Sequence, residues 1–523
     1  MEVRTPTRRH ATLKYHIKNW SSITDNRIVL DWVLGYSIPF KTLPFQPSLN
    51  RVSCPKKDLV YIEDLVAKLE ASGAIEQCSY TEGQFLSPIF LVDKPSGDKR
   101  LILNLKRLNE FVSAPPFRLE DHRTVRQLVW QGAYGTVVDI SDAYYAVNVR
   151  REHRKYLRFM VGNDIFQFKC LPFGLSSAPY TFVKLMKPIL AHLRSQGVTL
   201  ANYLDDFVIL GHSSDVCETH ANKLIELLTS LGFIINVDKC CLKASTSFTF
   251  LGFLFDSERM LITLPPEKAK RTKHLIDFFI NNRSCSIRDF AKLIGNLVSL
   301  CPASPYGWIH IKRAEKEKSR MLHTHDMNYD AEMYISDYVL PDLNWWSSHV
   351  NNLADTLRRD SFSLSFDSDS SLTGWGAVSG DEVISGWWSE EEQLLHINIL
   401  ELKAIFVGLQ HFASNLSHCN VIVRADNSTA IACVNRQGTV RSESLLTISR
   451  QLWEWCESRN IFIRATYIPS KENFRADEAS RRSPEGAEWS LHPTHFLSII
   501  KYFGVPSIDL FASAASAKCP VYV

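Results

Sequence analysis

The sequence predicts a multidomain protein of the α/β and α+β classes. A chain of 523 residues is too long for a single hydrophobic core, so two to four domains are expected. Strand-like and helix-like apolar patterns alternate in two stretches, up to about residue 260 and again from about residue 361. The intervening stretch, 265–350, has a helical and basic pattern. We therefore expect two α/β regions joined by a helical connector.

The first region alternates helices and strands. Residues 59–72 carry apolar side chains at helical spacing and end before Gly73, a typical helix stop. Strands are expected at 87–92 and 100–105, joined by a turn at 95–98. Further along, the same patterns predict strands at 133–140 and 166–171, a helix at 178–196, a hairpin at 200–210 and a helix that ends at Gly232.

The second region begins near Ser361. Its pattern predicts a strand, a second strand at 374–378, a helix from Glu401, a strand at 421–424, a further helix and a strand at 461–468. The expected parts of the chain are an N-terminal extension (1–34), a first α/β part (35–264), a helical connector (265–355), a second α/β domain (356–482) and a tail (483–523).

Composition gives little direct information about partners. The net charge of +3 is too small for nucleic-acid binding to be argued from global charge. Basic runs at 268–273 and 312–320 are open to two interpretations, a nucleic-acid contact or a solvated helix face. The 12 cysteines show no metal-binding spacing, and no long apolar run predicts a secretory signal or a membrane span. We expect a soluble intracellular protein, with cytoplasm and nucleus both open.

Acidic residues stand where two apolar runs end or bend. Asp139 ends the run 133–140, and Asp205-Asp206 interrupt the run 200–210. Burying an unpaired carboxylate is costly, so such acids are exposed or paired with cations. Three carboxylates on neighbouring strands can hold Mg²⁺, and two such ions can activate an attacking 3′-oxygen and stabilise a leaving pyrophosphate. An isolated Asp-Asp pair usually lies in a loop without a metal. The neighbouring motifs therefore decide whether these acids form a metal site.

Those motifs resemble the motifs of reverse transcriptases. VVDISDAYYAV (137–147), LPFGLSSAPYTFVKLM (171–186) and NYLDDFVIL (202–210) are similar to the first metal motif, the template-and-nucleotide helix and the YxDD hairpin of the palm. LGFIINVDKC and FTFLGFLF follow in the family's order, and SPIFLVDKPSGDKRLILNLKRLN upstream resembles the fingers hairpin. The resemblance covers about residues 35–265. It implies a right-hand polymerase with fingers and palm, followed by a thumb or connection.

The resemblance also implies roles for individual residues. Asp139, Asp205 and Asp206 would be the metal carboxylates, with Asp206 a supporting ligand. Tyr144 would lie under the incoming sugar and exclude a 2′-hydroxyl, with a core tyrosine as the alternative. The remaining candidates are the fingers arginine Arg100, its lysine partner (Lys94 or Lys99), the nucleotide-pocket residues Gly174 and Ser176, and Lys239 as proton donor to pyrophosphate.

Residues 362–481 resemble a ribonuclease H domain. DSSLTGWGAV, NILELKAI, RADNSTAIA and NFRADEASR appear in the family's order. Two of the acids end strands and one opens a helix, so they can converge at one edge of a sheet and hold two metal ions. Asp367 is an alternative to Asp369 as the first acid, and the spacing to the following Gly-Trp-Gly favours Asp369. The implied metal carboxylates are Asp369, Glu401, Asp426 and Asp477.

Two positions depart from the family patterns. Asn104 stands where many reverse transcriptases carry Asp, and the loop IPSKEN (468–473) lacks the histidine of retroviral relatives. Three further segments, GYSIPF (35–40), HINILELKA (396–404) and FGVPSIDLFAS (503–513), resemble DIRS-type retrotransposons, which transpose through a tyrosine recombinase.

The resemblance thus implies a retrotransposon RNA-directed DNA polymerase that also degrades the RNA strand of RNA–DNA hybrids. The expected cofactor is Mg²⁺, two ions per active site, with Mn²⁺ as a substitute. The expected partners are an RNA template, a DNA primer, RNA–DNA hybrid, deoxynucleoside triphosphates and other element proteins such as a recombinase, with no membrane. A decayed or domesticated protein that binds hybrid without turnover is the alternative, and the presence of all seven candidate acids favours the enzyme.

Overall fold

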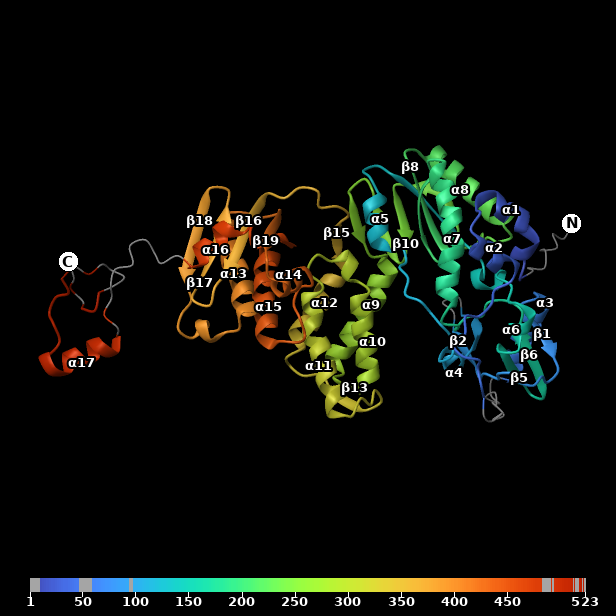
Figure 1. Ribbon diagram of the computed structural model, residues 1–523, viewed down its shortest axis with the longest axis horizontal. Helices are drawn as coiled ribbons and strands as arrows, with labels where there is room; N and C mark the ends of the chain where they lie inside the picture. The colour runs from blue at the N-terminus through green and yellow to red at the C-terminus, as the bar shows by residue number, and fades with distance from the viewer. Residues whose placement is uncertain are drawn as a thin grey trace. The chain divides into compact units, whose positions relative to one another are not determined.

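The computed structural model describes residues 10–46, 59–93, 97–481, 491, 493–510, 512, 517–519 and 521. They form two compact units (Figure 1). Unit 1 comprises the residues up to Ala269 together with 352–358, and unit 2 comprises 270–351 and the residues from Arg359 onward. The chain therefore leaves unit 1, returns to it for seven residues, and leaves it again.

A four-stranded antiparallel sheet forms the centre of unit 1. Residues 206–211 follow one another as Asp-Phe-Val-Ile-Leu-Gly, and all but the first are buried, which explains why this strand is apolar on both faces. Helices α7 (Ala178–Ser195) and α8 (Ser214–Ser230) pack against the sheet (Figure 1). In spatial order the strands are β7 (Thr199–Tyr203), β8 (Asp206–Gly211), β4 (Tyr134–Asp139) and β9 (Cys241–Ser245).

Two smaller sheets accompany α3 (Leu59–Ala71) in unit 1. The first contains β1 (Ile75–Cys78), β6 (Asp164–Phe168) and β5 (Arg158–Val161), and the second is the hairpin of β2 (Ile89–Asp93) and β3 (Lys99–Leu103). The strand predicted at 166–171 lies at 164–168. A two-residue turn, in which Gly162 has a φ of +60°, fixes the beginning of β6 opposite Val161.

The N-terminal residues contribute to the core of unit 1. Residues 10–34, which the sequence assigns to an extension, include α1 (Ile17–Ile23) and α2 (Arg27–Leu34). Leu13 and Trp20 are fully buried, and Nε1 of Trp20 donates a hydrogen bond to the carbonyl oxygen of Leu231 at 3.0 Å. This segment therefore packs as part of unit 1.

A second four-stranded sheet in unit 1 includes a strand from far along the chain. Its order is β10 (Ser247–Phe250), β11 (Phe253–Asp256), β12 (Leu261–Thr263) and β15 (Ala354–Thr356). Arg126 of α5 (His122–Leu128) forms an ion pair with Asp355 at 2.9 Å. Both partners are mostly buried, so the returning strand is tied to the unit by charge as well as by its sheet register.

The predicted helical connector consists mainly of helices. These are α9 (Pro266–Asn281), α10 (Ile287–Val298), α11 (Lys312–Thr324) and α12 (Leu340–His349), with a short pair of strands, β13 (Ser284–Ser286) and β14 (Glu332–Tyr334). Within unit 2, the connector packs against α15 (Glu443–Ser458). Asp342, 1% exposed, accepts a hydrogen bond from Arg450 at 2.9 Å, and Nε2 of His310 lies 3.2 Å from Oε2 of Glu457.

A five-stranded mixed sheet forms the rest of unit 2. Its order is β18 (Glu382–Trp387), β17 (Gly374–Ser379), β16 (Leu364–Ser370), β19 (Asn420–Ala425) and β20 (Phe462–Tyr467). The first three strands are antiparallel, whereas β16, β19 and β20 are parallel. The accompanying helices are α13 (Ile397–Phe412), α14 (Ser428–Asn435), α15, α16 (Phe474–Arg481) and, in the tail, α17 (Pro493–Phe503).

Helix α13 begins earlier than the sequence predicts. It starts at Ile397, so Glu401 lies in its second turn and does not open it. The ring of His396 accepts a hydrogen bond from the amide of Asn398 and caps the helix. Histidine is not one of the usual N-cap residues, so this beginning was missed. Among the described residues, no helix has the length and apolar character needed to cross a membrane.

Candidate active sites

Three acids meet at one end of the central sheet of unit 1. The register of β4 and β8 places Asp139 opposite Asp206. Asp205 lies in the tight turn between β7 and β8, and its carbonyl oxygen accepts a hydrogen bond from the amide of Ile140 at 3.0 Å. Leu204 in this turn has a φ of +54°. The hairpin thus holds both aspartates beside the end of β4.

The three acids strongly perturb one another. Burial, a hydrogen bond with Asp139 and the charges of Asp205 and Asp139 raise the pKa of Asp206 to about 7. Burial also raises the pKa of Asp205. Nζ of Lys239 lies 3.3 Å from Oδ2 of Asp139, with the lysine side chain 66% exposed. Lys239 and Arg100 both act on Asp205, but the pKa values of Asp205 and Asp206 are still raised, and such a set of oxygen donors fits a hard divalent cation.

Two polar residues that the sequence analysis did not single out hold this hairpin. Nδ2 of Asn202 donates to the carbonyl oxygens of Leu204 and Asp206, at 2.7 and 3.2 Å. The amide of Asn202 donates to Glu120, which also forms an ion pair with Arg194 at 2.7 Å. An asparagine next to a tight turn is the sequence signal that could have identified Asn202.

Tyr144 and Arg100 both contact Phe173. Tyr144 belongs to the short helix η3 (Ala143–Ala146), and its ring packs edge-on against Phe173 and Phe182 at centroid distances of 5.2 and 5.4 Å. Burial and the charge of Asp205 raise the pKa of the Tyr144 hydroxyl. The guanidinium of Arg100, on β3, lies 4.5 Å from the centroid of Phe173. The half-buried Tyr144 ring is therefore close to the acidic turn.

The Gly174 turn is closely packed against β3. Gly174 has a φ of +96°, and a Cβ there would lie 2.8 Å from the carbonyl oxygen of Leu103. Asn109, at the end of α4 (Lys106–Asn109), spans the turn by donating to the carbonyl of Gly174 and accepting from the amide of Ser176, both at 2.9 Å. Ser176 Oγ is buried and has no hydrogen-bond partner among the described residues. Asn109 was also missed.

The fingers hairpin accounts for the remaining candidates in unit 1. Lys94 lies outside the described residues. Lys99 lies 3.5 Å from Asp93 and 6.0 Å from the centroid of the Tyr61 ring. Asn104 is exposed, and its Oδ1 accepts from the amide of Lys106 at 3.2 Å. The side chain of Asn104, the residue that departs from the family pattern, is therefore bonded to the first residue of α4.

A second group of acids converges in unit 2. Asp369 lies near the end of β16, Glu401 on α13 and Asp426 directly after β19, and one oxygen of each lies within 4.8 Å of the others. Among the described residues this is the one triple of acids whose ligand oxygens all lie that close together.

The charge of the unit 2 triple is only partly compensated, because Arg481, the partner of Asp477, also acts on Asp369. Burial and the charges of Asp369, Asp426 and Asp477 raise the pKa of Glu401 to about 9. Burial and the neighbouring acids raise the pKa of Asp369 to about 6, although Ser480 donates a hydrogen bond to it at 2.8 Å. Oε2 of Glu401 is buried without a hydrogen-bond partner among the described residues. An orphaned carboxylate oxygen facing two further acids fits a divalent cation.

The other two candidate acids of unit 2 have arginine partners. Asp477, on α16, forms an ion pair with Arg481 at 2.8 Å, and its charge acts on both Asp369 and Glu401. Asp367 pairs with Arg424, its neighbour in the β16–β19 register, through a 2.7 Å hydrogen bond. The charge of Asp367 is therefore neutralised by Arg424, whereas Asp369 belongs to the acidic triple.

The loop 468–473, which lacks the retroviral histidine, contacts the triple through other groups. Oγ of Ser470 donates to Oδ2 of Asp426 at 2.6 Å. Nδ2 of Asn473, 1% exposed, donates to the carbonyl oxygen of Ser368 at 3.1 Å. Sequence reasoning missed both residues, because a serine or asparagine in a polar loop carries no distinctive signal.

The basic run 312–320 is largely neutralised within unit 2. Lys312 pairs with Glu315 at 3.1 Å, Lys316 contacts Glu443, and Arg320 pairs with Glu317 at 2.9 Å. In the run 268–273, Nζ of Lys268 donates to the carbonyl of Gly252 and Lys273 pairs with Asp277. These contacts favour the interpretation of a charged helix surface for the run 312–320. In the run 268–273, Lys270 and Arg271 are exposed, and both interpretations stay open there.

Family models match both α/β regions. The model described as reverse transcriptase (RNA-dependent DNA polymerase) matches residues 92–255, and one described as reverse transcriptase-like matches 365–483. Similar proteins include a putative enzymatic polyprotein of Cassava vein mosaic virus, 24% identical over 71% of this chain and 56% of the relative. The Gag-Pro-Pol polyprotein of Squirrel monkey retrovirus is 28% identical over 46% of this chain and 12% of the relative. The transposon Tf2-3 polyprotein of Schizosaccharomyces pombe is 26% identical over 42% of this chain and 15% of the relative. The chain thus spans about half of the first relative and much less of the others.

Solved structures share the fold of this chain. The foamy viral protease-reverse transcriptase in complex with an RNA/DNA hybrid has a TM-score of 0.50 at 14% identity, over 92% of this chain and 66% of that one. The dRH form of the same foamy viral protein, in complex with double-stranded DNA, also has a TM-score of 0.50 at 14% identity. This match covers 88% of this chain and 83% of that one. The predicted fold class, a right-hand polymerase followed by an RNase H-like α/β domain, is confirmed.

Proposed function

We propose that this chain, whose reverse transcriptase and RNase H-like domains are those of retroelement polyproteins, copies RNA into DNA and degrades the RNA of the resulting hybrid. The observation that carries the polymerase function is the register of β4 and β8, because it brings Asp139 and Asp206 face to face beside Asp205. An RNA template, a DNA primer and deoxynucleoside triphosphates are the proposed substrates.

Asp139, Asp205 and Asp206 would hold Mg²⁺, with Mn²⁺ as a substitute, and the ions would supply Lewis-acid activation of the 3′-oxygen and charge neutralisation. Lys239 would deliver a proton to the leaving group, and its distance of 3.3 Å from Asp139 supports this role. The raised pKa of Asp206 supports the need for a cation at this site.

The groups around Phe173 would bind the nucleotide. Arg100, whose guanidinium lies 4.5 Å from the centroid of the Phe173 ring, would bind the triphosphate. Tyr144 would lie beneath the sugar, and its packing against Phe173 and Phe182 keeps the ring from moving aside for a 2′-hydroxyl. Gly174 and Ser176 would line the pocket, and Lys94 or Lys99 would assist Arg100.

The hydrolytic function is proposed for Asp369, Glu401 and Asp426, with Asp477 as the fourth acid. These residues would hold the ions that activate water and stabilise the leaving 3′-oxygen. The convergence of three carboxylate oxygens within 4.8 Å and the orphaned oxygen of Glu401 support this proposal. Ser470 and Ser480 would orient Asp426 and Asp369 through the hydrogen bonds that they donate.

Paired substitutions test the two functions separately. Asp205→Asn is expected to abolish primer extension on a defined RNA template and to leave hybrid cleavage intact, whereas Asp426→Asn is expected to do the reverse. The exposed residues Asp215 and Asp381 provide matched controls as Asp→Asn variants that retain both activities. Survival of both activities in both site variants would contradict the assignments. A wild-type chain that binds hybrid but neither extends nor cleaves would instead be a decayed binding protein.

We further propose a DIRS-type element as the source, with a recombinase among the partners, on the strength of the segments 35–40, 396–404 and 503–513. The proposed layout remains an extension (1–34), fingers and palm (35–264), thumb or connection (265–355), RNase H-like domain (356–482) and tail (483–523). Tyr36 supports a role for the first segment inside the polymerase core, because its buried hydroxyl donates to Ser177 Oγ at 2.8 Å.

A further inference from the structure

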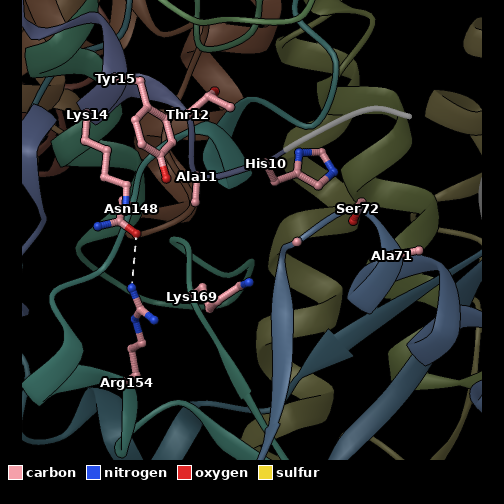
Figure 2. A pocket seen from close by; sticks show the side chains of 11 residues that line it. His10, Ala11, Thr12, Lys14, Tyr15, Ala71, Ser72, Asn148, Arg154 and Lys169 are labelled. Carbon is pink, nitrogen blue, oxygen red and sulfur yellow. Dashed lines mark hydrogen bonds between the residues drawn. The ribbon is translucent and has the colours of Figure 1, made fainter. Parts of the chain in front are cut away.

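Unit 1 contains a cavity of about 350 Å³ away from the proposed nucleotide site. Figure 2 shows the side chains around it, which come from the N-terminal segment, the end of α3, the residue after β6 and the region of α6 (Arg151–Arg154). Its volume falls within the range of small-molecule sites, about 300–1,000 Å³. None of the residues proposed for polymerase or ribonuclease chemistry lines it.

Three permanent cations line this cavity, namely Lys14, Arg154 and Lys169. Arg154 pairs with Glu76 at 3.1 Å and donates to Oδ1 of Asn148 at 3.2 Å, the bond drawn in Figure 2. No carboxylate among the described residues forms an ion pair with either lysine. Glu76 offsets part of this positive charge, since it pairs with Arg154 and also interacts electrostatically with Lys169. The remaining like charges around one partly enclosed volume repel one another, so an anion in the cavity would relieve this repulsion.

The cavity wall is held in place by hydrogen bonds. The amide of His10 donates to the carbonyl of Ser72, and the amide of Ala11 donates to that of Tyr145, both at 2.8 Å. Oγ1 of Thr12 donates to the carbonyl of Gly232, also at 2.8 Å. These bonds join the N-terminal segment to three separate parts of unit 1. The cavity is therefore preformed, which lowers the entropic cost of binding.

The ammonium group of Lys169 lies beside the turn at Gly73. Gly73 has a φ of +80°, and a Cβ at that position would lie 3.9 Å from Nζ of Lys169. The ring of Tyr15 lines the same cavity, with Nζ of Lys14 4.9 Å from its centroid. Both lysines are half-buried, so their charges are screened less than those of fully exposed lysines.

We propose that this cavity binds a small phosphate-bearing molecule, with its phosphate against Lys14, Arg154 and Lys169. A planar guanidinium and two ammonium groups can donate to several oxygens at once. A phosphate has more acceptor oxygens and more negative charge than a single carboxylate, so it is the better match for this set of cations. This site is separate from the proposed triphosphate site on Arg100 and would bind without a divalent ion.

Calorimetric titration of the full chain in EDTA tests the proposal, with inorganic pyrophosphate and ATP as probes. Wild-type protein is expected to bind at least one probe, and Lys14→Gln/Lys169→Gln is expected to weaken its Kd at least tenfold. The control Lys18→Gln/Lys223→Gln removes two exposed charges that do not line the cavity and is expected to bind as wild type. Since neither pocket lysine forms an ion pair, the double variant is expected to keep the wild-type melting temperature.

Several results would overturn the proposal. These are no binding of either probe by the wild type at millimolar concentration, an unchanged Kd in the pocket variant, and equal binding of citrate, which would indicate a general anion site. Loss of binding in Arg100→Gln with normal binding in the pocket variant would place the probe in the nucleotide site. Lysine-dependent binding of a 5′-phosphorylated oligonucleotide but not of pyrophosphate would identify a nucleic-acid contact instead. All of these readouts are independent of polymerase activity.

Discussion

Replacing Glu401 with glutamine probes the electrostatics of the unit 2 triple without metal. Glu401 is 5% exposed, and burial with the neighbouring acids raises its pKa to about 9 from an ordinary value of 4.5. In the unfolded chain the group ionises near the ordinary value. Between these two values folding takes up one proton, so the free energy of unfolding must fall as the pH rises.

The expected effect is large. One bound proton corresponds to a slope of about 1.4 kcal/mol per pH unit. At pH 7.5, three units above the ordinary pKa, the wild type is thus destabilised by about 4 kcal/mol, to order of magnitude. The glutamine variant takes up no proton at this position. It should therefore gain up to that amount, less about 1–3 kcal/mol for burying an amide without partners.

Urea unfolding of the full chain in EDTA, followed by tryptophan fluorescence from pH 5.5 to 8.5, measures this slope. Asp369 titrates in both proteins, so the difference between wild type and Glu401→Gln is the quantity to compare. The exposed Glu390→Gln variant serves as the control and should follow the wild type. Parallel stability curves for wild type and Glu401→Gln would refute the reasoning. Saturating Mg²⁺ should stabilise the wild type more than the variant, by about 3 kcal/mol at 100 times Kd.

Three further substitutions test other parts of the structure. Gly174→Ala forces a Cβ to 2.8 Å from the carbonyl of Leu103 at a φ of +96°, so kcat/KM for deoxynucleotides should fall at least tenfold, and an unchanged value would contradict the packing. Tyr144→Ala should raise ribonucleotide over deoxynucleotide incorporation at least tenfold in steady-state primer extension, with Tyr80→Ala, an exposed tyrosine, as control. Arg450→Met should cost unit 2 about 3–5 kcal/mol in urea unfolding by leaving the buried Asp342 underpaired, and the second change Asp342→Leu should recover part of that loss.

The periodicity of apolar residues was sufficient to predict a helix or strand where that element is long or buried on both faces. The run 206–210 is apolar at every position after Asp206, and the acids at its start mark the turn, so both the hairpin and its acidic tip could be predicted. The helices at 59–71 and 178–195 likewise follow from their apolar spacing and their stops. The convergence of Asp369 and Asp426 could be predicted because both acids were expected at strand ends, and the structure shows that the two strands are parallel neighbours.

What the sequence could not provide were contacts between distant, ordinary polar residues. Asn109 and Asn202 hold the two turns of the unit 1 site through backbone carbonyls and amides, and such hydrogen bonds impose no periodicity. The arginine partners of Asp367 and Asp477 lie on another strand and one helical turn away, so the difference between these acids and Asp369 appears only in three dimensions. Their roles in binding metal stay predictions.

The return of residues 352–358 to unit 1 has a consequence for dividing the protein into pieces. A fragment that ends near residue 265 would contain every polymerase motif yet lack β15. Strand β12 would then be an unpaired sheet edge, and Arg126 would lose Asp355. Such an edge invites pairing with other molecules. Insolubility of that fragment would thus reflect a missing strand, whereas grafting residues 352–358 onto its end through a short linker should restore a monomer.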